Sequence, residues 1–219
     1  MLFTFYYENG QMNDLERRWA ALAGTSPAAA AAGADLLRRW AEPHRHYHST
    51  GHLTHILGAV DELAAAAADA DAVRFAAWFH DAVYDGRPGE DEAASARLAR
   101  DVLTGLDRPA ALADEVERLV LLTASHDPAP GDTNGAVLCD ADLAVLAGPP
   151  SDYAAYASAV RDDYAHVPDA DFAAGRAAVL AGLLDRPALF HTETGRRRWE
   201  DAARHNLETE LVLLRASGS

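Results

Sequence analysis

Lysine is absent from this chain, and arginine supplies all 19 of its basic side chains. Against them stand 34 aspartates and glutamates, so the formal net charge is −15 at pH 7. Proteins that bind nucleic acid or anionic membranes contact the phosphates through basic stripes. So acidic a chain argues against both as general partners, and a small anionic ligand would need a metal or a few arginines to offset the charge.

Cysteine is nearly absent as well. Cys139 stands alone, so no internal disulfide can form, and free cysteine of this kind is most often a small buried apolar residue. Long apolar runs are missing: none approaches the ~20 residues of a membrane span. No charged segment followed by an apolar one resembles a signal peptide. We therefore expect a cytoplasmic protein that does not cross a membrane.

Strand-like alternation of apolar and polar residues is also missing, and nearly every segment has the helical period. Helices are expected at 13–22, 27–40, 51–68, 71–79, 90–103, 109–125, 152–164, 169–184 and 195–214. Segment 137–146 could pass for a strand, but we interpret it as a buried helix. The chain is therefore predicted to be all-α, with a single-domain helical bundle over 13–219. Residues 1–12 are interpreted as a vector-derived or disordered start.

Two ligand-type side chains stand side by side at the end of an apolar helix. The run Val73 to Phe79 is followed directly by His80 and Asp81. Burying such polar groups without partners costs about 1–3 kcal/mol each. The doublet therefore indicates that something binds these two side chains.

Further candidate ligands lie upstream and downstream of the doublet. Five of the ten histidines fall in 42–55, where His52 and His55 are three apart and neighbours on one helix face. Asp140 and Asp142 lie in the buried segment 137–146, and His126 ends another helix. Imidazole with carboxylate suits Mn, Fe, Co, Ni, Mg or Zn, and four protein ligands leave two positions of an octahedral ion open. A divalent metal site of the catalytic kind is predicted.

These residues carry a resemblance. A lone helical histidine, a His-Asp doublet about 25 positions later, and a late aspartate in Asp-Ala-Asp-Leu resemble the HD superfamily of metal-dependent phosphohydrolases. One bacterial branch, whose members are predicted HD phosphohydrolases, is similar over about residues 13 to 214. The similar stretches are 45–55, 80–85, 138–146, 153–164, 175–176 and 199–210.

The resemblance implies a ligand set of His55, His80, Asp81 and the late aspartate. Related enzymes with an Asp-x-Asp usually use the second aspartate, which favours Asp142 over Asp140 as the fourth ligand. Nucleotidase branches often carry a glutamate three residues after the doublet, where this chain has Tyr84. The resemblance therefore predicts a metal far better than it predicts a substrate.

The implied activity is hydrolysis of a small phosphorylated molecule, a phosphomonoester or a nucleotide, by a metal-activated water. Asp81 and His126 are the candidate catalytic side chains. Arg45 is the best of four arginine candidates for the phosphate, because it adjoins the histidine-rich stretch. His48, His52 and His126 could hold a second ion, although His48 and His52 are slightly better explained as supports of the ligands.

Two alternatives stay open at this point. A non-catalytic module could keep the metal and bind a phosphorylated ligand without turnover, and a purely structural metal site could leave the function to a protein partner. A homodimer through the apolar C-terminal helix is a further possibility, beside packing of that helix on its own core.

Overall fold

The structure, a computed structural model, describes residues 12–217. Apart from Met12, the segment interpreted as a vector-derived or disordered start therefore lies outside the described residues. The α-helices are α1 (Asp14–Ala23), α2 (Pro27–Trp40), α3 (Thr50–Leu63), α4 (Ala70–Phe79), α5 (Glu90–Gly105), α6 (Ala110–Leu122), α7 (Thr133–Leu143), α8 (Pro150–Asp163), α9 (Asp169–Leu184) and α10 (Glu193–Ser217). Two short 3-10 helices, η1 (Ala64–Ala66) and η2 (Ala144–Ala147), extend α3 and α7.

The prediction of an all-α helical bundle is confirmed, since the described residues contain no strand. Segment 137–146 is helical, as interpreted. Local signals account for several helix starts. Asn13 and Glu16 form a reciprocal capping box at the start of α1, and the Ser26 side chain caps α2 ahead of Pro27. At α4 the cap is Asp69, whose carboxylate accepts hydrogen bonds from the N–H groups of Asp71 and Ala72.

Helix α4 is the central element of the larger core. Seven of its ten residues are buried, and α3, α5, α6 and α7 pack around it. A helix whose last five residues are all buried is stable only in such an enclosed position. Trp19 of α1 meets Phe75 and Phe79 edge-on, at centroid distances of 5.9 and 6.1 Å. The end of α4, where the His-Asp doublet begins, is therefore held from several directions.

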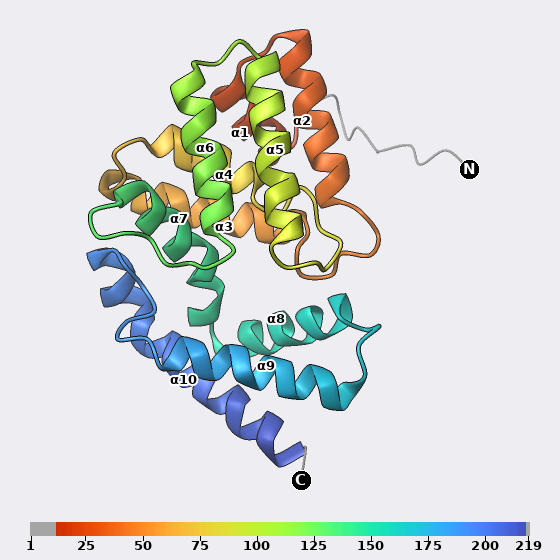
Figure 1. The fold of residues 1–219 in the computed structure, drawn as a ribbon, viewed down its shortest axis with the longest axis vertical. Coiled ribbons are helices and arrows are strands. Elements are labelled where there is room, and N and C mark those ends of the chain that lie inside the picture. Colours follow the sequence, from red (N-terminus) through yellow and green to blue (C-terminus); the bar gives the residue numbers. More distant parts are fainter. Residues whose placement is uncertain (1–11, 218–219) are drawn as a thin grey trace.

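A second, smaller core joins the last third of the chain to the rest. In Figure 1, α8, α9 and α10 lie below the bundle of α1 to α7, and η2 connects the two groups. Leu146 of η2 packs with Leu180, Phe190 and Leu207. Trp199 packs against both cores, so the two groups share one continuous apolar contact.

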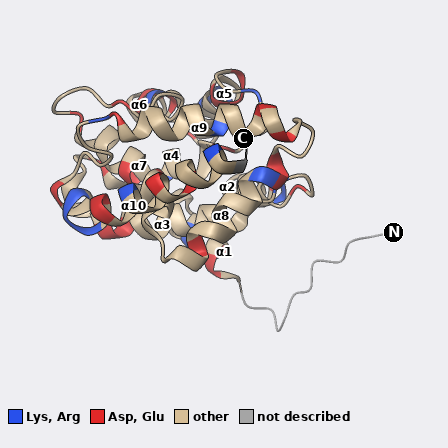
Figure 2. Ribbon diagram, turned by 90° about the horizontal axis from the view of Figure 1, so that it is seen from below, with Lys and Arg blue, Asp and Glu red and all other residues tan. Residues whose placement is uncertain are grey.

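Charged side chains lie around the outside of the helices. In the view of Figure 2, arginines and acidic residues are interspersed, without a continuous basic band. Many arginines pair with acids, as Arg118 does with Glu115 and Asp132. Within the part of the chain that the structure describes, no helix is both long enough and apolar enough to cross a membrane.

One close helix contact gives a stability prediction. A Cβ atom at Gly33 of α2 would lie 2.3 Å from the Trp19 ring, so we expect Gly33→Ala to destabilise the fold by about 1–3 kcal/mol through overpacking. Gly182 of α9 has open space around its Cβ position, and Gly182→Ala should stabilise the fold by about 0.5–1 kcal/mol. Urea unfolding of both variants measures the difference. Equal effects of the two substitutions would contradict the contact.

Candidate metal centre

His80 is the residue that ends α4, and its ring is held in one orientation. It is 1% exposed, its Nδ1 lies 3.0 Å from the carbonyl oxygen of Ala77, and the Trp40 ring packs against it at 5.4 Å. A carbonyl oxygen only accepts hydrogen bonds, so Nδ1 carries the hydrogen. Nε2 is then the free nitrogen, which is how metal-binding histidines are usually oriented. It lies 3.1 Å from Oδ2 of Asp81, the next residue.

His52 of α3 faces His80. Their Nε2 atoms lie 3.1 Å apart, and the His52 ring is 4% exposed. The Tyr47 ring packs over it at a centroid distance of 4.7 Å. His52, His80 and Asp81 therefore bring three ligand-type side chains to one point, and one ligand atom from each lies within 4.8 Å of the others. This group could hold a metal ion.

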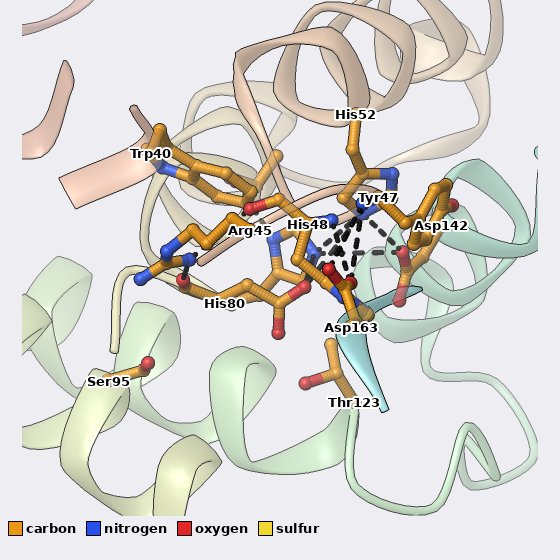
Figure 3. A network of polar contacts seen from close by, with 12 residues as sticks. Trp40, Arg45, Tyr47, His48, His52, His80, Ser95, Thr123, Asp142 and Asp163 are labelled. Atoms are coloured by element: carbon orange, nitrogen blue, oxygen red, sulfur yellow. Dashed lines mark hydrogen bonds and ion pairs between the residues drawn. The ribbon is translucent and has the colours of Figure 1, made fainter. Parts of the chain in front are cut away.

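Asp142 of α7 adjoins the group (Figure 3). Its Oδ1 lies 3.1 Å from Nε2 of His52 and 3.6 Å from Nε2 of His80. Its Oδ2 lies 2.7 Å from Nε2 of His126. Two imidazoles and two carboxylates thus converge from α3, from the end of α4 and from α7, and this donor set fits a divalent ion of the kind predicted.

The histidines and carboxylates of the group shift one another's pKa values. Burial lowers the pKa of His80, but the carboxylates of Asp81 and Asp142 outweigh burial and raise this pKa to about 9. Burial lowers the pKa of His52, against an opposing hydrogen bond with Asp142. Although burial works against its charged form, Asp142 has its pKa held well below the ordinary value by His80 and by the hydrogen bonds from His126 and His52. Without metal, the group therefore keeps one proton on His80.

This proton predicts how metal affinity depends on pH. An ion can bind Nε2 of His80 only after displacing the proton, whereas burial lowers the pKa of His52 and favours its neutral form. Because the pKa of His80 is about 9, we expect the affinity for Zn or Mn to rise about tenfold per pH unit from pH 6 to 8. Titration calorimetry in buffers of different ionisation enthalpy measures the affinity and the released proton together. A flat affinity over this interval, with no proton released, would contradict the prediction.

His126 lies just after α6 in a conformation that is uncommon for a residue with a side chain. Its φ is +49°, in the left-handed region. Arg186 holds this turn through Nη1 and Nη2, which donate to the carbonyl oxygens of His126 and Ser125 at 3.0 and 2.9 Å. The turn aims the imidazole at Asp142, so His126 contacts the group through that carboxylate.

The structure does not bring His55 into the cluster, where His52 lies instead. His55 is exposed on α3. His52 lies four residues before Ile56 and eleven before Leu63, on the buried side of the helix, whereas His55 lies seven residues before the exposed Glu62. The apolar period of α3 already carried this signal, since a buried ligand must share the side of the helix that is buried.

Arg45 does not present its guanidinium to a ligand. It is 6% exposed, and its Nη1 donates to the carbonyl oxygen of Asp81 at 2.6 Å while Nη2 donates to that of Ala82 at 3.2 Å. It also pairs with the Glu42 carboxylate. The interpretation of Arg45 as a phosphate-binding residue is therefore replaced by a structural one, because its donors already hold the segment that follows His80 (Figure 3).

The other arginine candidates differ in availability. Arg161 pairs with Asp169 and with loop carbonyl groups, and Arg176 makes a bidentate pair with Glu210 at 2.8 and 3.0 Å. The Arg87 side chain is 66% exposed, and its contact with Glu90 is 4.0 Å long. Of the candidates, Arg87 is the one with its charge at an open position beside the cluster.

Asp140 holds two parts of the chain together. It is fully buried, and its carboxylate accepts the N–H groups of His191 at 2.6 Å and Thr192 at 2.8 Å. A Cβ atom at Gly195 would lie 2.4 Å from this carboxylate, so α10 begins directly against it. Asp142 thus lies at the cluster and Asp140 does not, which is the arrangement that the sequence interpretation favoured.

A cavity of about 230 Å³ with both polar and apolar walls opens onto the cluster. Its polar walls include His48, His80, Asp81, Tyr84, Arg87, Asp91, Glu92, Thr123, His126, Asp142 and Tyr156, and its apolar walls include Leu143, Val145 and Leu146. A second, larger cavity of about 690 Å³ has His52, His55 and Trp199 among its walls. The cluster is therefore reachable from a small, partly acidic space, and Arg87 is the arginine in its walls.

Comparisons of the chain with profiles of protein families, with curated proteins and with solved structures found no match, so the resemblance to the HD superfamily stays a prediction.

Proposed function

We propose that this protein is a divalent-metal-dependent hydrolase that acts on a small phosphorylated molecule. The observation that carries the proposal is that His52, His80, Asp81 and Asp142 converge, and that His80, Asp81 and Asp142 of this group line a cavity. A closed structural metal site would have no such opening. The 230 Å³ cavity has room for a phosphoryl group and a water, which is what hydrolysis requires.

A bound divalent ion would lower the pKa of a water molecule and offset the charge of the phosphoryl oxygens. The side chains of the protein would position the ion and the substrate. Asp81 and His80 would bind the ion at the cavity wall, and His52 and Asp142 would complete the set from α3 and α7. His126 orients Asp142 through its 2.7 Å contact. Arg87, at the cavity rim, is placed to attract the anionic substrate.

The test separates hydrolysis from binding alone. Chelator-treated protein is reloaded with Mn, Fe, Co, Ni, Mg or Zn, and phosphate release is measured from phosphomonoesters, nucleotides and cyclic nucleotides. We expect release that depends on the metal and is lost in Asp81→Ala. Inorganic phosphate that binds the loaded protein, without turnover of any substrate, would favour the non-catalytic binding module. Failure to bind any of these metals would end both proposals.

A further inference from the structure

Asp163, the last residue of α8, anchors the histidine-rich loop that precedes α3. Its side chain has no exposed surface, and it accepts the N–H groups of His46 at 2.5 Å and Tyr47 at 3.3 Å. It also contacts Nδ1 of His48 at 2.7 Å. Burial favours the neutral acid, but the hydrogen bonds from His48 and the loop hold the pKa of Asp163 below its usual value. The loop is therefore bound to a carboxylate contributed by α8.

Adjacent acidic residues such as Asp162 and Asp163 usually form a solvated helix face, but the Asp163 side chain has no exposed surface. The residue lies 115 positions from His48, and no local pattern marks it. The helical period of α8 is weak, because only Tyr153 and Val160 of that helix are buried. The contact exists because α8 lies across the bundle of α1 to α7, next to the loop (Figure 1).

This contact determines which nitrogen of His48 is available. A carboxylate only accepts hydrogen bonds, so Nδ1 carries the hydrogen. The Tyr84 ring stacks on His48 at 4.1 Å and the Tyr47 ring meets it edge-on at 4.8 Å, which fixes the plane of the imidazole. The hydrogen bonds of His48 to residues 12–217 use its backbone and Nδ1, which leaves Nε2. His48 lines the 230 Å³ cavity together with Asp81, so this nitrogen is available beside the cluster (Figure 3).

An imidazole oriented by a carboxylate at one nitrogen, with the other nitrogen facing a reaction space, is the arrangement that general acid–base catalysis uses. Asp142 contacts Nε2 of His52 at 3.1 Å, whereas the carboxylate that His48 contacts is Asp163, at 2.7 Å. The ring centroid of His48 lies 6.1 Å from that of His52. The geometry therefore distinguishes His48 from the candidate ligands while placing it beside them.

We propose that His48 donates a proton to the leaving-group oxygen of the substrate, and that Asp163 is its positioning residue; the inference rests on the proposed hydrolase function. In this step the bond from phosphorus to the leaving oxygen breaks as the bond from the water oxygen to phosphorus forms. In this step His48 is an imidazolium with a hydrogen on each ring nitrogen, and Nε2 gives its proton to the leaving oxygen while Nδ1 keeps its hydrogen bond to Asp163. The proton lost by the attacking water restores His48, so an alcohol and inorganic phosphate are the products.

The test uses the leaving group as the variable. Good leaving groups such as 4-nitrophenolate depart without a proton, whereas benzyl alkoxide needs one. For His48→Gln we expect kcat on benzyl phosphate to fall about 100-fold or more, and kcat on 4-nitrophenyl phosphate to fall less than about threefold. A plot of log kcat against leaving-group pKa, over a series of such esters, should become steeper. Asp163→Asn should steepen it less, with KM unchanged.

The matched control is His46→Gln. His46 lies on the same loop and gives its backbone N–H to Asp163, but its side chain is exposed, so its slope should equal that of wild type. Metal affinity and melting temperature of His48→Gln should stay near wild type. An unchanged slope, an equal loss on all esters, or a loss of metal would overturn the role of His48. Absence of turnover in the wild type on every ester would overturn the hydrolase proposal and this inference with it.

Discussion

His52→Ala is expected to lower the affinity for divalent metal by at least about 100-fold, because loss of a direct ligand should cost more than the 10–100-fold that loss of a supporting residue costs. The Nε2 atom of His52 lies 3.1 Å from both Nε2 of His80 and Oδ1 of Asp142, so the substitution removes a ligand atom from between two others. Metal content after dialysis and the dissociation constant from calorimetry measure the effect.

His55→Ala is the matched control for that substitution. It removes the same side chain three residues later on α3, from an exposed position. We expect wild-type metal affinity and a melting temperature within a few degrees of wild type. If His55→Ala lost the metal and His52→Ala retained it, the ligand set that the resemblance implied would hold, and the geometry of α3 described above would be wrong.

The second large effect is expected at the two aspartates of α7, where one substitution should reduce metal affinity and the other should reduce stability. Asp142→Ala is expected to lose metal affinity at least about 100-fold, since it removes a carboxylate that contacts His52, His80 and His126. Its metal-free form loses the contacts with His80 and His126, but no backbone N–H of the described residues loses an acceptor, so it should lose less stability than Asp140→Ala.

Asp140→Ala should do the opposite. It leaves the N–H groups of His191 and Thr192 without their acceptor, and each unpaired buried donor costs about 1–3 kcal/mol. We expect a loss of about 2–5 kcal/mol in the free energy of unfolding, with metal affinity retained in the folded fraction. Denaturant unfolding beside metal titration measures both quantities. Loss of metal in Asp140→Ala at full stability would show that the two roles are assigned the wrong way round.

Several features of the site could be read from the chain because they depend on neighbouring residues. An apolar run that ends in His80 and Asp81 indicates a buried helix with ligands at its end, since both properties belong to one segment. The choice of Asp142 over Asp140 rested on a resemblance and not on chemistry. Both aspartates are buried or nearly so. They differ in what they face, because Asp142 faces α3 and Asp140 faces the start of α10.

Arg45 shows why proximity in sequence misleads for long side chains. It adjoins the histidine-rich stretch, yet its guanidinium is directed to the carbonyl groups of Asp81 and Ala82. Backbone carbonyl groups just after a helix lack partners within the chain segment itself, and an arginine can satisfy two of them at once. The residues around Arg45 do not show that carbonyl groups on another segment lack hydrogen-bond partners.

By itself, the sequence determined the all-α class, most of the helix positions and the His80-Asp81 doublet, because helical period and caps act over a few residues. The apolar period of α3 could show that His52 is the buried histidine, but only the tertiary structure decided that this face meets the doublet, that Arg45 is internal, and that Asp163 holds His48. Each of these depends on which face of one helix is turned toward another element, and that direction is set by packing across the whole core and not by any single segment.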